Sequence, residues 1–200
     1  MGWTVETLNE TVDAELEALP EGLRARLARI AHLIEDEGLE RVGEPSVKHL
    51  LGRLWEIRLK GRSGVLSVAA RGQRVVVVRV LARKMRKTWR EASLFSDGGV
   101  AMARVVDMHE KWMTEPKYRE AYAAFEEEFA LASVVIGLRT RAGLTQEELA
   151  RRMGTTQLIV SRLESGRWHP SMRTLQRLAQ ATGSRLLIGF EPVDAKRAGG

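Results

Sequence analysis

The stretch from Leu144 to Pro170 constrains the fold of this chain more than any other part of its sequence. Its small, glycine and apolar residues recur at the spacing of two short helices that pack across a tight turn. Ala150 is small where the helices would cross, Gly154 allows the turn between them, and Val160 points inward from the second helix. The spacing therefore predicts a helix-turn-helix.

Capping signals set the limits of the helices around this turn. Thr145 and Glu148 form a capping box that starts the first helix, and Gln157 starts the second. Ser171 caps a third helix, which we expect to end at Gly183. The following segment, RLLIGFEP at 185–192, alternates weakly and is predicted as a strand that forms a dimer edge.

The second helix leaves a polar surface on its N-terminal half, which is the part of such a motif that enters a DNA major groove. We expect the outward residues to contact DNA. They are Thr155, Thr156, Gln157, Leu158, Ser161 and Arg162. A glutamine amide pairs with adenine in a bidentate geometry, which is worth about 1–3 kcal/mol of base discrimination.

Residues 132–182 resemble the Xre or phage-repressor DNA-binding domain, through the register of Ala150, Gly154 and Val160 and the ESGR and PS that follow. The resemblance implies a homodimer bound to two operator half-sites. It also implies roles for individual residues. Gln157 would read a base, Arg162 would contact guanine or phosphate, and Ser161 and Leu158 would contact base edges or a thymine methyl. Phosphate contacts are implied near Gln146 and Thr156 and at Arg167.

Composition limits the remaining classes of function. With 200 residues, 44% of them hydrophobic, the chain can form two small domains, each with its own core. The absence of cysteine excludes disulfides and thiolate metal sites, and it favours a cytoplasmic protein. The four histidines stand singly and no apolar run is long enough for a membrane span, so we expect no metal, no cofactor and no membrane partner.

Charge alternates along the chain in blocks. Residues 1–47 hold 4 basic and 11 acidic side chains, whereas residues 48–90 hold 13 basic and 1 acidic. An acidic block at 102–137 and a second basic block at 138–177 follow. The two basic blocks indicate two surfaces that face polyanions. The alternative is that the opposite charges pair within the fold.

The first half reads as a mixture of helices and strands. A short strand at 3–8 precedes helices at 9–19 and 20–38, and strands follow at 54–60, 65–70 and 73–81. Their short connections predict an antiparallel meander, with one face packed on the helices and Val75–Val78 in a central, covered strand.

This order resembles the RelE superfamily, specifically the HigB-like or phage Gp49-like toxins, over residues 3–94. The resemblance rests on LWEIRLKGRSG, GQRVVVVRVL and the Lys/Arg-rich segment after them. It implies a ribosome-dependent endonuclease acting on mRNA. Cations there would stabilise the phosphate while other groups move protons. The catalytic candidates that it assigns are Arg58, Arg79, Lys84 and Lys87.

The sequence departs from that family in its basic segment and middle strand. It has Leu81 and Trp89 where the family has a Phe and a closing Pro, and VLSVAA lacks the usual Arg and Tyr. Three alternatives remain open: an inactive toxin half, an active endonuclease silenced by the second half, and a module that binds RNA or the ribosome without cleavage.

Residues 102–149 resemble the N-terminus of HigA-like antitoxins, with a helical region from Thr114 to about Arg141. Its acidic residues, Glu126–Glu128, are expected to stay exposed. This helical region is a candidate to neutralise the basic block at 48–90, in cis or in trans.

The sequence thus predicts an α+β protein, a small RelE-like domain of helices on an antiparallel sheet followed by an all-α helix-turn-helix domain. The expected limits are 1–96 for the toxin-like domain, 97–113 for a linker with a flexible Gly98-Gly99, 114–192 for the antitoxin-like domain and 193–200 for a disordered tail. The expected function is repression of its own operon.

Overall fold

The computed structural model describes residues 2–60, 64–81 and 103–190. The predicted roles of Lys84, Lys87, Gly98-Gly99 and the tail at 193–200 concern residues outside these ranges. The first half contains β1 (Thr4–Thr7), α1 (Glu10–Glu17), α2 (Glu21–Glu37), α3 (Leu39–Val42), β2 (Val47–Leu51), β3 (Leu54–Lys60), β4 (Gly64–Arg71) and β5 (Arg74–Leu81). The second contains α4 (Val105–Trp112), α5 (Pro116–Ala123), α6 (Glu126–Arg141), α7 (Gln146–Arg152), α8 (Gln157–Glu164) and α9 (Met172–Ala181).

The strands of the first half form one five-stranded sheet in the order β1-β5-β4-β3-β2. The strands β3 to β5 pair antiparallel, as the short connections predicted, β2 pairs antiparallel with β3, and β1 pairs parallel with β5. The sequence prediction missed β2. Only Val47 of this edge strand is buried, so the alternation of apolar and polar residues that marks a half-buried strand is absent.

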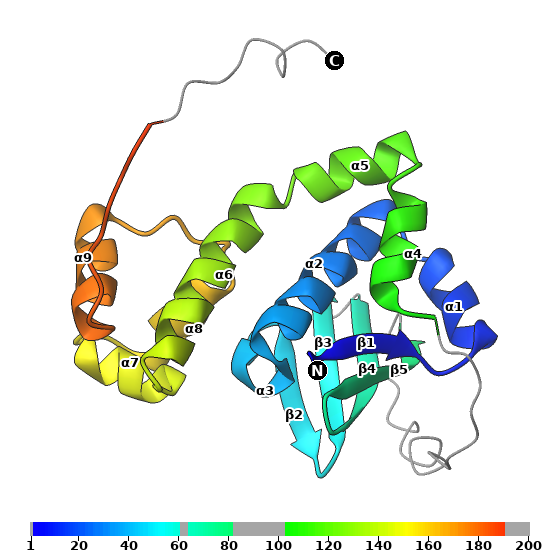
Figure 1. Ribbon diagram of the computed structural model, residues 1–200, viewed down its shortest axis with the longest axis horizontal. Coiled ribbons are helices and arrows are strands. Elements are labelled where there is room, and N and C mark those ends of the chain that lie inside the picture. The colour runs from blue at the N-terminus through cyan, green and yellow to red at the C-terminus, as the bar shows by residue number, and fades with distance from the viewer. Residues whose placement is uncertain (1, 61–63, 82–102, 191–200) are drawn as a thin grey trace.

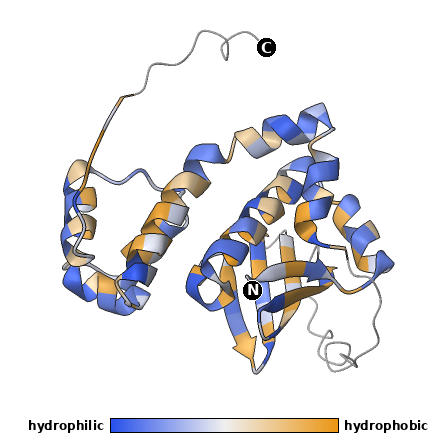
Figure 2. Ribbon diagram, viewed as in Figure 1, coloured by the Kyte–Doolittle hydropathy of each residue, from blue (hydrophilic) through white to orange (hydrophobic). Residues whose placement is uncertain are grey.

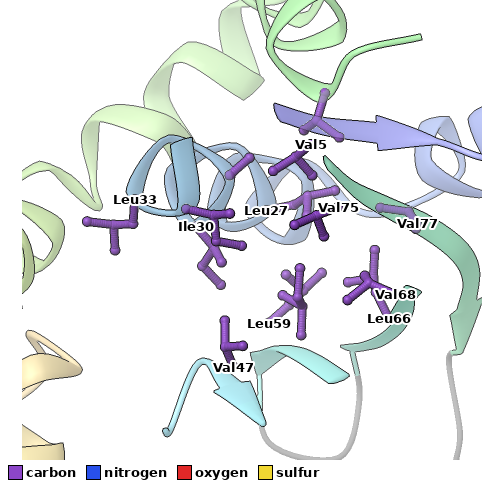
Figure 3. Packing of buried hydrophobic residues seen from close by; sticks show 14 of the residues in the cluster. Val5, Leu27, Ile30, Leu33, Val47, Leu59, Leu66, Val68, Val75 and Val77 are labelled. Carbon is purple, nitrogen blue, oxygen red and sulfur yellow. The ribbon is translucent and has the colours of Figure 1, made fainter. Parts of the chain in front are cut away.

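The core of the first half lies between α2 and one face of the sheet (Figure 3). Leu27 and Ile30 of α2 meet Leu59, Leu66 and other strand residues there, and none of these four side chains is exposed. Figure 2 shows apolar residues interleaved with polar ones along α2, as expected of a helix with one buried face.

All four residues from Val75 to Val78 are buried, and β5 lies inside the sheet between β1 and β4. This confirms the prediction of a central, covered strand. A continuous apolar run is the pattern that burial on both faces requires, because neither face of such a strand meets water.

The helices α4 and α5 pack on α2, and α4 also contacts β1 at the edge of the sheet (Figure 1). Residues 105–112 had been assigned to the linker, but they form α4, and Val105 and Trp112 are fully buried in the core of the first half. Tyr118 of α5 joins the same core. The apolar residues of α4 recur at three- and four-residue spacing, which is the pattern of a helix with one buried face. The nearby pair Gly98-Gly99 nevertheless favours a linker in the prediction from sequence.

The second half has its own helical core, formed by α6 to α9. Leu149, Val160 and Leu163 are fully buried there. None of the helices in the described part of the chain is long and apolar enough to cross a membrane.

The predicted strand at 185–192 is wrong for residues 185–190, which form no strand. Leu187, Ile188 and Phe190 are exposed, Phe190 almost completely at 99%. A strand needs a neighbouring backbone to complete its hydrogen bonds, and no other strand lies in the described part of the second half.

Candidate nucleic-acid interface

The helix-turn-helix forms at the residues that the sequence predicted. The hydroxyl of Thr145 accepts from the backbone N–H of Glu148 at 3.1 Å, and the carboxylate of Glu148 accepts from the N–H of Thr145 at 2.8 Å. These hydrogen bonds lower the pKa of Glu148. Gly154, at φ +63°, makes the turn, a left-handed conformation that a side chain would strain. The capping box thus fixes where α7 begins, and Gly154 sets its angle to α8.

A buried ion pair holds α6 and α8 together behind this surface. Arg139 Nε donates to Glu164 Oε1 at 2.5 Å, and Arg139 Nη2 donates to Glu164 Oε2 at 3.2 Å. Gln146 Nε2 also donates to Glu164 Oε2, at 2.7 Å. Burial raises the pKa of Glu164, while the hydrogen bonds from Arg139 and Gln146 oppose the rise. The sequence pattern did not predict this ion pair, although Glu164 is the first residue of the ESGR motif.

The predicted DNA-contacting residues lie together on α7, α8 and the turn between them. Gln157, Leu158 and Arg162 are exposed on α8, Leu158 to 59%, and Thr156 caps the helix. Thr155, Ser161 and Gln146 are half-buried. The side chains of Gln157 and Gln146 are joined by a hydrogen bond of 3.5 Å, Nε2 to Oε1. The exposed donors and acceptors of α8 can therefore reach base edges and phosphates.

Arg167, a predicted DNA-contacting residue, forms an ion pair with Glu128 of the same chain. Arg167 Nε donates to Glu128 Oε1 at 3.2 Å, so this arginine faces the start of α6. Glu128 had been expected to stay exposed, yet its side chain is only 18% exposed because it meets both Arg167 and Arg26.

The first half contacts the helix-turn-helix through the connection between α3 and β2. The backbone oxygen of Glu44 accepts from Gln146 Nε2 at 2.9 Å and from Ser161 Oγ at 3.3 Å. Nearby, Arg139 Nη2 donates to the backbone oxygen of Arg41 at 2.6 Å. Two of the predicted DNA-contacting residues thus contact the chain's own first half.

A second contact between the halves runs along α2. Arg24 forms a bidentate pair with Glu115, with Nη1–Oε1 at 3.0 Å and Nη2–Oε2 at 2.7 Å. Arg26 pairs with Glu128, and Arg29 pairs with Glu126. The hydrogen bond from Arg24 holds the pKa of Glu115 below its usual range.

Each of these arginines also lies over an aromatic ring of the second half. The guanidinium carbon of Arg29 is 3.7 Å from the centre of the Tyr122 ring, and those of Arg24 and Arg26 are 5.2 Å from Trp112 and Phe125. Such contacts add a cation–π attraction to each ion pair. In the part of the chain that the structure describes, the acidic helix region therefore docks on α2, whereas the sequence had suggested the basic block at 48–90 as its partner.

A cluster of rings fills the space between α2, α4 and α5. His109 Nδ1 lies 2.8 Å from the hydroxyl of Tyr118, and the rings of His109 and His32 meet edge to face at 5.3 Å. Burial, together with the nearby His32 and Arg29, lowers the pKa of His109 to about 4. His109 is therefore neutral near pH 7.

The two catalytic candidates that the structure describes, Arg58 and Arg79, lie on the strands on either side of β4. The register places Ser67 of β4 opposite both Glu56 of β3 and Arg79 of β5. Arg58 Nε donates to Glu56 Oε1 at 2.5 Å, and Arg79 Nε lies 3.6 Å from Glu15 Oε1. Both arginines thus face carboxylates of the same half. No group of three or more His, Asp or Glu residues suited to a metal ion occurs among the described residues.

Comparison with known proteins finds two separate family matches along the chain. Residues 14–94 match the family of phage-derived Gp49-like proteins, and residues 137–187 match a helix-turn-helix family. No solved structure matches the chain.

Among the curated relatives, antitoxin HigA1 of Mycobacterium tuberculosis is 36% identical over 77 residues, which is 38% of this chain and 52% of HigA1. The match thus spans only about half the length of that relative. The HTH-type transcriptional regulator y4dJ of Sinorhizobium fredii is 52% identical over 57 residues, 28% of this chain and 74% of y4dJ. A regulator of Archaeoglobus fulgidus is 35% identical over 48 residues, 24% of this chain and 69% of the relative.

Each family match agrees with the fold of the segment that it covers. Most of the α+β half, from within α1 through β5, lies inside the Gp49-like match, and the helices α7 to α9 lie within the helix-turn-helix match. The chain therefore belongs to the helix-turn-helix family of transcriptional regulators, and it carries, ahead of that domain, a Gp49-like domain of the RelE/HigB toxin type.

Proposed function

We propose that this protein is a sequence-specific repressor that binds the promoter of its own operon, as a homodimer, through α8. The observation that carries the proposal is the exposure of Gln157, Leu158 and Arg162 along one capped helix of a helix-turn-helix. Gln157 would read adenine, and Arg162 would contact guanine or phosphate, which are the pairings that their donor geometry favours.

Fluorescence anisotropy with the duplex immediately upstream of the protein's own coding sequence tests this role. Gln157→Ala and Arg162→Ala should each weaken binding about tenfold, since a good bidentate base contact is worth about 1–3 kcal/mol. Gln180→Ala removes an exposed glutamine from α9 and serves as the matched control. Unchanged affinity and sequence preference in the two α8 variants would show that α8 does not read DNA.

We further propose that the segment from α4 to α6 acts as an antitoxin for the first half of the same chain. The three ion pairs along α2, each combined with an aromatic contact, support this role. The name of the HigA1 relative, an antitoxin, agrees with it.

For the first half we propose a toxin-type domain that does not cleave mRNA. The carboxylates beside Arg58 and Arg79 support this, because a guanidinium paired with a carboxylate is less able to stabilise a phosphate. The alternative is an endonuclease that uses Arg58, Arg79, Lys84 and Lys87 and is silenced by the tethered antitoxin segment.

Expression of residues 1–101 alone separates these two possibilities. Normal growth and intact mRNA, with the fragment shown by circular dichroism to be folded, are expected of the inactive domain. Arrested growth with cleaved mRNA would instead establish the endonuclease. A second culture that also expresses residues 102–200, which include the buried Trp112 and Tyr118 that the fragment lacks, is the control for the endonuclease outcome, because the antitoxin segment should restore growth there in trans.

A further inference from the structure

The connection between α3 and β2, residues 43–46, lies against the surface that would meet DNA. The backbone oxygen of Glu44 accepts hydrogen bonds from Gln146 on α7 and from Ser161 on α8, at 2.9 and 3.3 Å. Ser161 follows Gln157 by one helical turn and so shares its face of α8. One main-chain oxygen of the first half thus bridges the two helices of the motif on the side that carries Gln157.

Two further contacts hold this connection in place. Arg139 Nη2 donates to the backbone oxygen of Arg41 at 2.6 Å, just before the 43–46 connection begins. A Cβ atom at Gly43 would lie 3.5 Å from Nε2 of Gln146, so a side chain added there would be in van der Waals contact with the amide. The connection is therefore packed on the motif over several residues.

The Glu44 backbone oxygen accepts hydrogen bonds from the same side chains that would donate to DNA. Gln146 and Ser161 are donors suited to phosphate oxygens or base acceptors, and the carbonyl of Glu44 takes up both of them. The Glu44 residue itself is exposed, and a carboxylate beside this surface repels phosphates.

We infer that the 43–46 connection and operator DNA compete for the same surface of α7 and α8, so that DNA binding requires the connection to leave. The inference rests on the DNA-binding role proposed above for α8. The first half then sets the apparent DNA affinity, because only the fraction of molecules with the connection displaced binds, and the apparent Kd rises as that fraction falls.

Two leucine substitutions at glycines of similar positive φ test this competition in the full chain. Gly43 has φ +57° and Gly52 has φ +56°, so both substitutions place a leucine at positive φ, and ψ −171° adds backbone strain at Gly43. At Gly52 the added Cβ meets nothing within 4 Å, whereas at Gly43 it faces the amide of Gln146. Gly43→Leu should therefore push the connection away from α7, and Gly52→Leu should not.

The readout is anisotropy with the upstream duplex, after circular dichroism has shown that each variant is folded. Gly43→Leu should raise the affinity at least about threefold over wild type and over Gly52→Leu. Equal affinity of all three proteins would overturn the competition. Absence of binding by all three would overturn the DNA-binding function itself, so the two failures are distinguishable.

A second measurement does not depend on the folding of Gly43→Leu. The chain contains no cysteine, so Glu44→Cys and Glu147→Cys can carry a pair of nitroxide labels at defined positions. Dipolar broadening of the spectrum should be strong without DNA and lost at saturating upstream duplex. Broadening that persists at saturation, or that is absent from the free protein, would overturn the inference.

Discussion

Arg139 of α6 and Glu164 of α8 form an ion pair whose side chains are only 8% and 0% exposed. The guanidinium also donates to the backbone oxygens of Leu144 and Arg41, at 3.2 and 2.6 Å. A single side chain thereby ties α6 to α8, to the start of the motif and to the first half. Burial makes the loss of either charge costly, since the remaining one cannot turn to water.

Replacement of Arg139 by methionine should destabilise the protein strongly. Glu164 would remain buried without its charged partner, which costs about 3–5 kcal/mol in comparable sites. Arg177→Met, on the exposed surface of α9, is the control and should change the unfolding free energy little. Urea denaturation measures both, and a stable Arg139→Met protein would show that the pair contributes nothing.

Glu115→Gln should weaken the docking of α5 on α2. The change removes the charge that faces Arg24, a side chain that is only 7% exposed and would lose its bidentate partner. The expected result is a lower thermal midpoint and faster proteolysis of the α4–α6 segment. Glu127→Gln, an exposed position on α6, should leave both unchanged. Identical behaviour of the two variants would argue against a contribution from the Arg24 pair.

Acidification should destabilise the protein through His109. Its pKa is about 4 in the fold, because burial and its neighbours His32 and Arg29 disfavour the charged ring, against an ordinary value of 6.5. Between these values the unfolded chain binds more protons, so the free energy of unfolding falls as the pH drops from about 6.5 towards about 4. His109→Gln should flatten this part of the profile.

The control for that profile is His169→Gln, which alters an exposed histidine and should leave the pH dependence unchanged. Thermal melts across this pH range provide the comparison. If His109→Gln and wild type lose stability in parallel on acidification, other groups are responsible.

Trp112→Ala should test whether α4 belongs to the core of the first half. The indole is fully buried, and its Nε1 donates to Glu17 at 2.8 Å, so its removal leaves a cavity and takes one hydrogen-bond donor from the Glu17 carboxylate. The expected loss is about 3–5 kcal/mol. Lys111→Ala, at the adjacent and 74% exposed position, should cost less than about 1 kcal/mol. Similar losses at both positions would contradict the packing.

The local elements were largely predictable because their signals are local. The capping box at Thr145, the glycine turn at Gly154 and the continuous apolar run of β5 each depend on a few neighbouring residues, and each forms where it was expected. The edge strand β2 and the absence of a strand at 185–190 escaped prediction, since pairing depends on which backbone lies alongside.

The sequence by itself determined the two half-chains and the helix that presents Gln157 and Arg162, because periodicity and caps act over a few turns. Only the tertiary structure determined which oppositely charged side chains pair with each other. In the described part of the chain the acidic helix region pairs with arginines of α2, which lie outside the basic block at 48–90, and the backbone oxygen of Glu44 accepts a hydrogen bond from Gln146 across more than a hundred residues of chain. Such pairings depend on how the packed helices bring distant segments together, and no pattern along the sequence records that proximity.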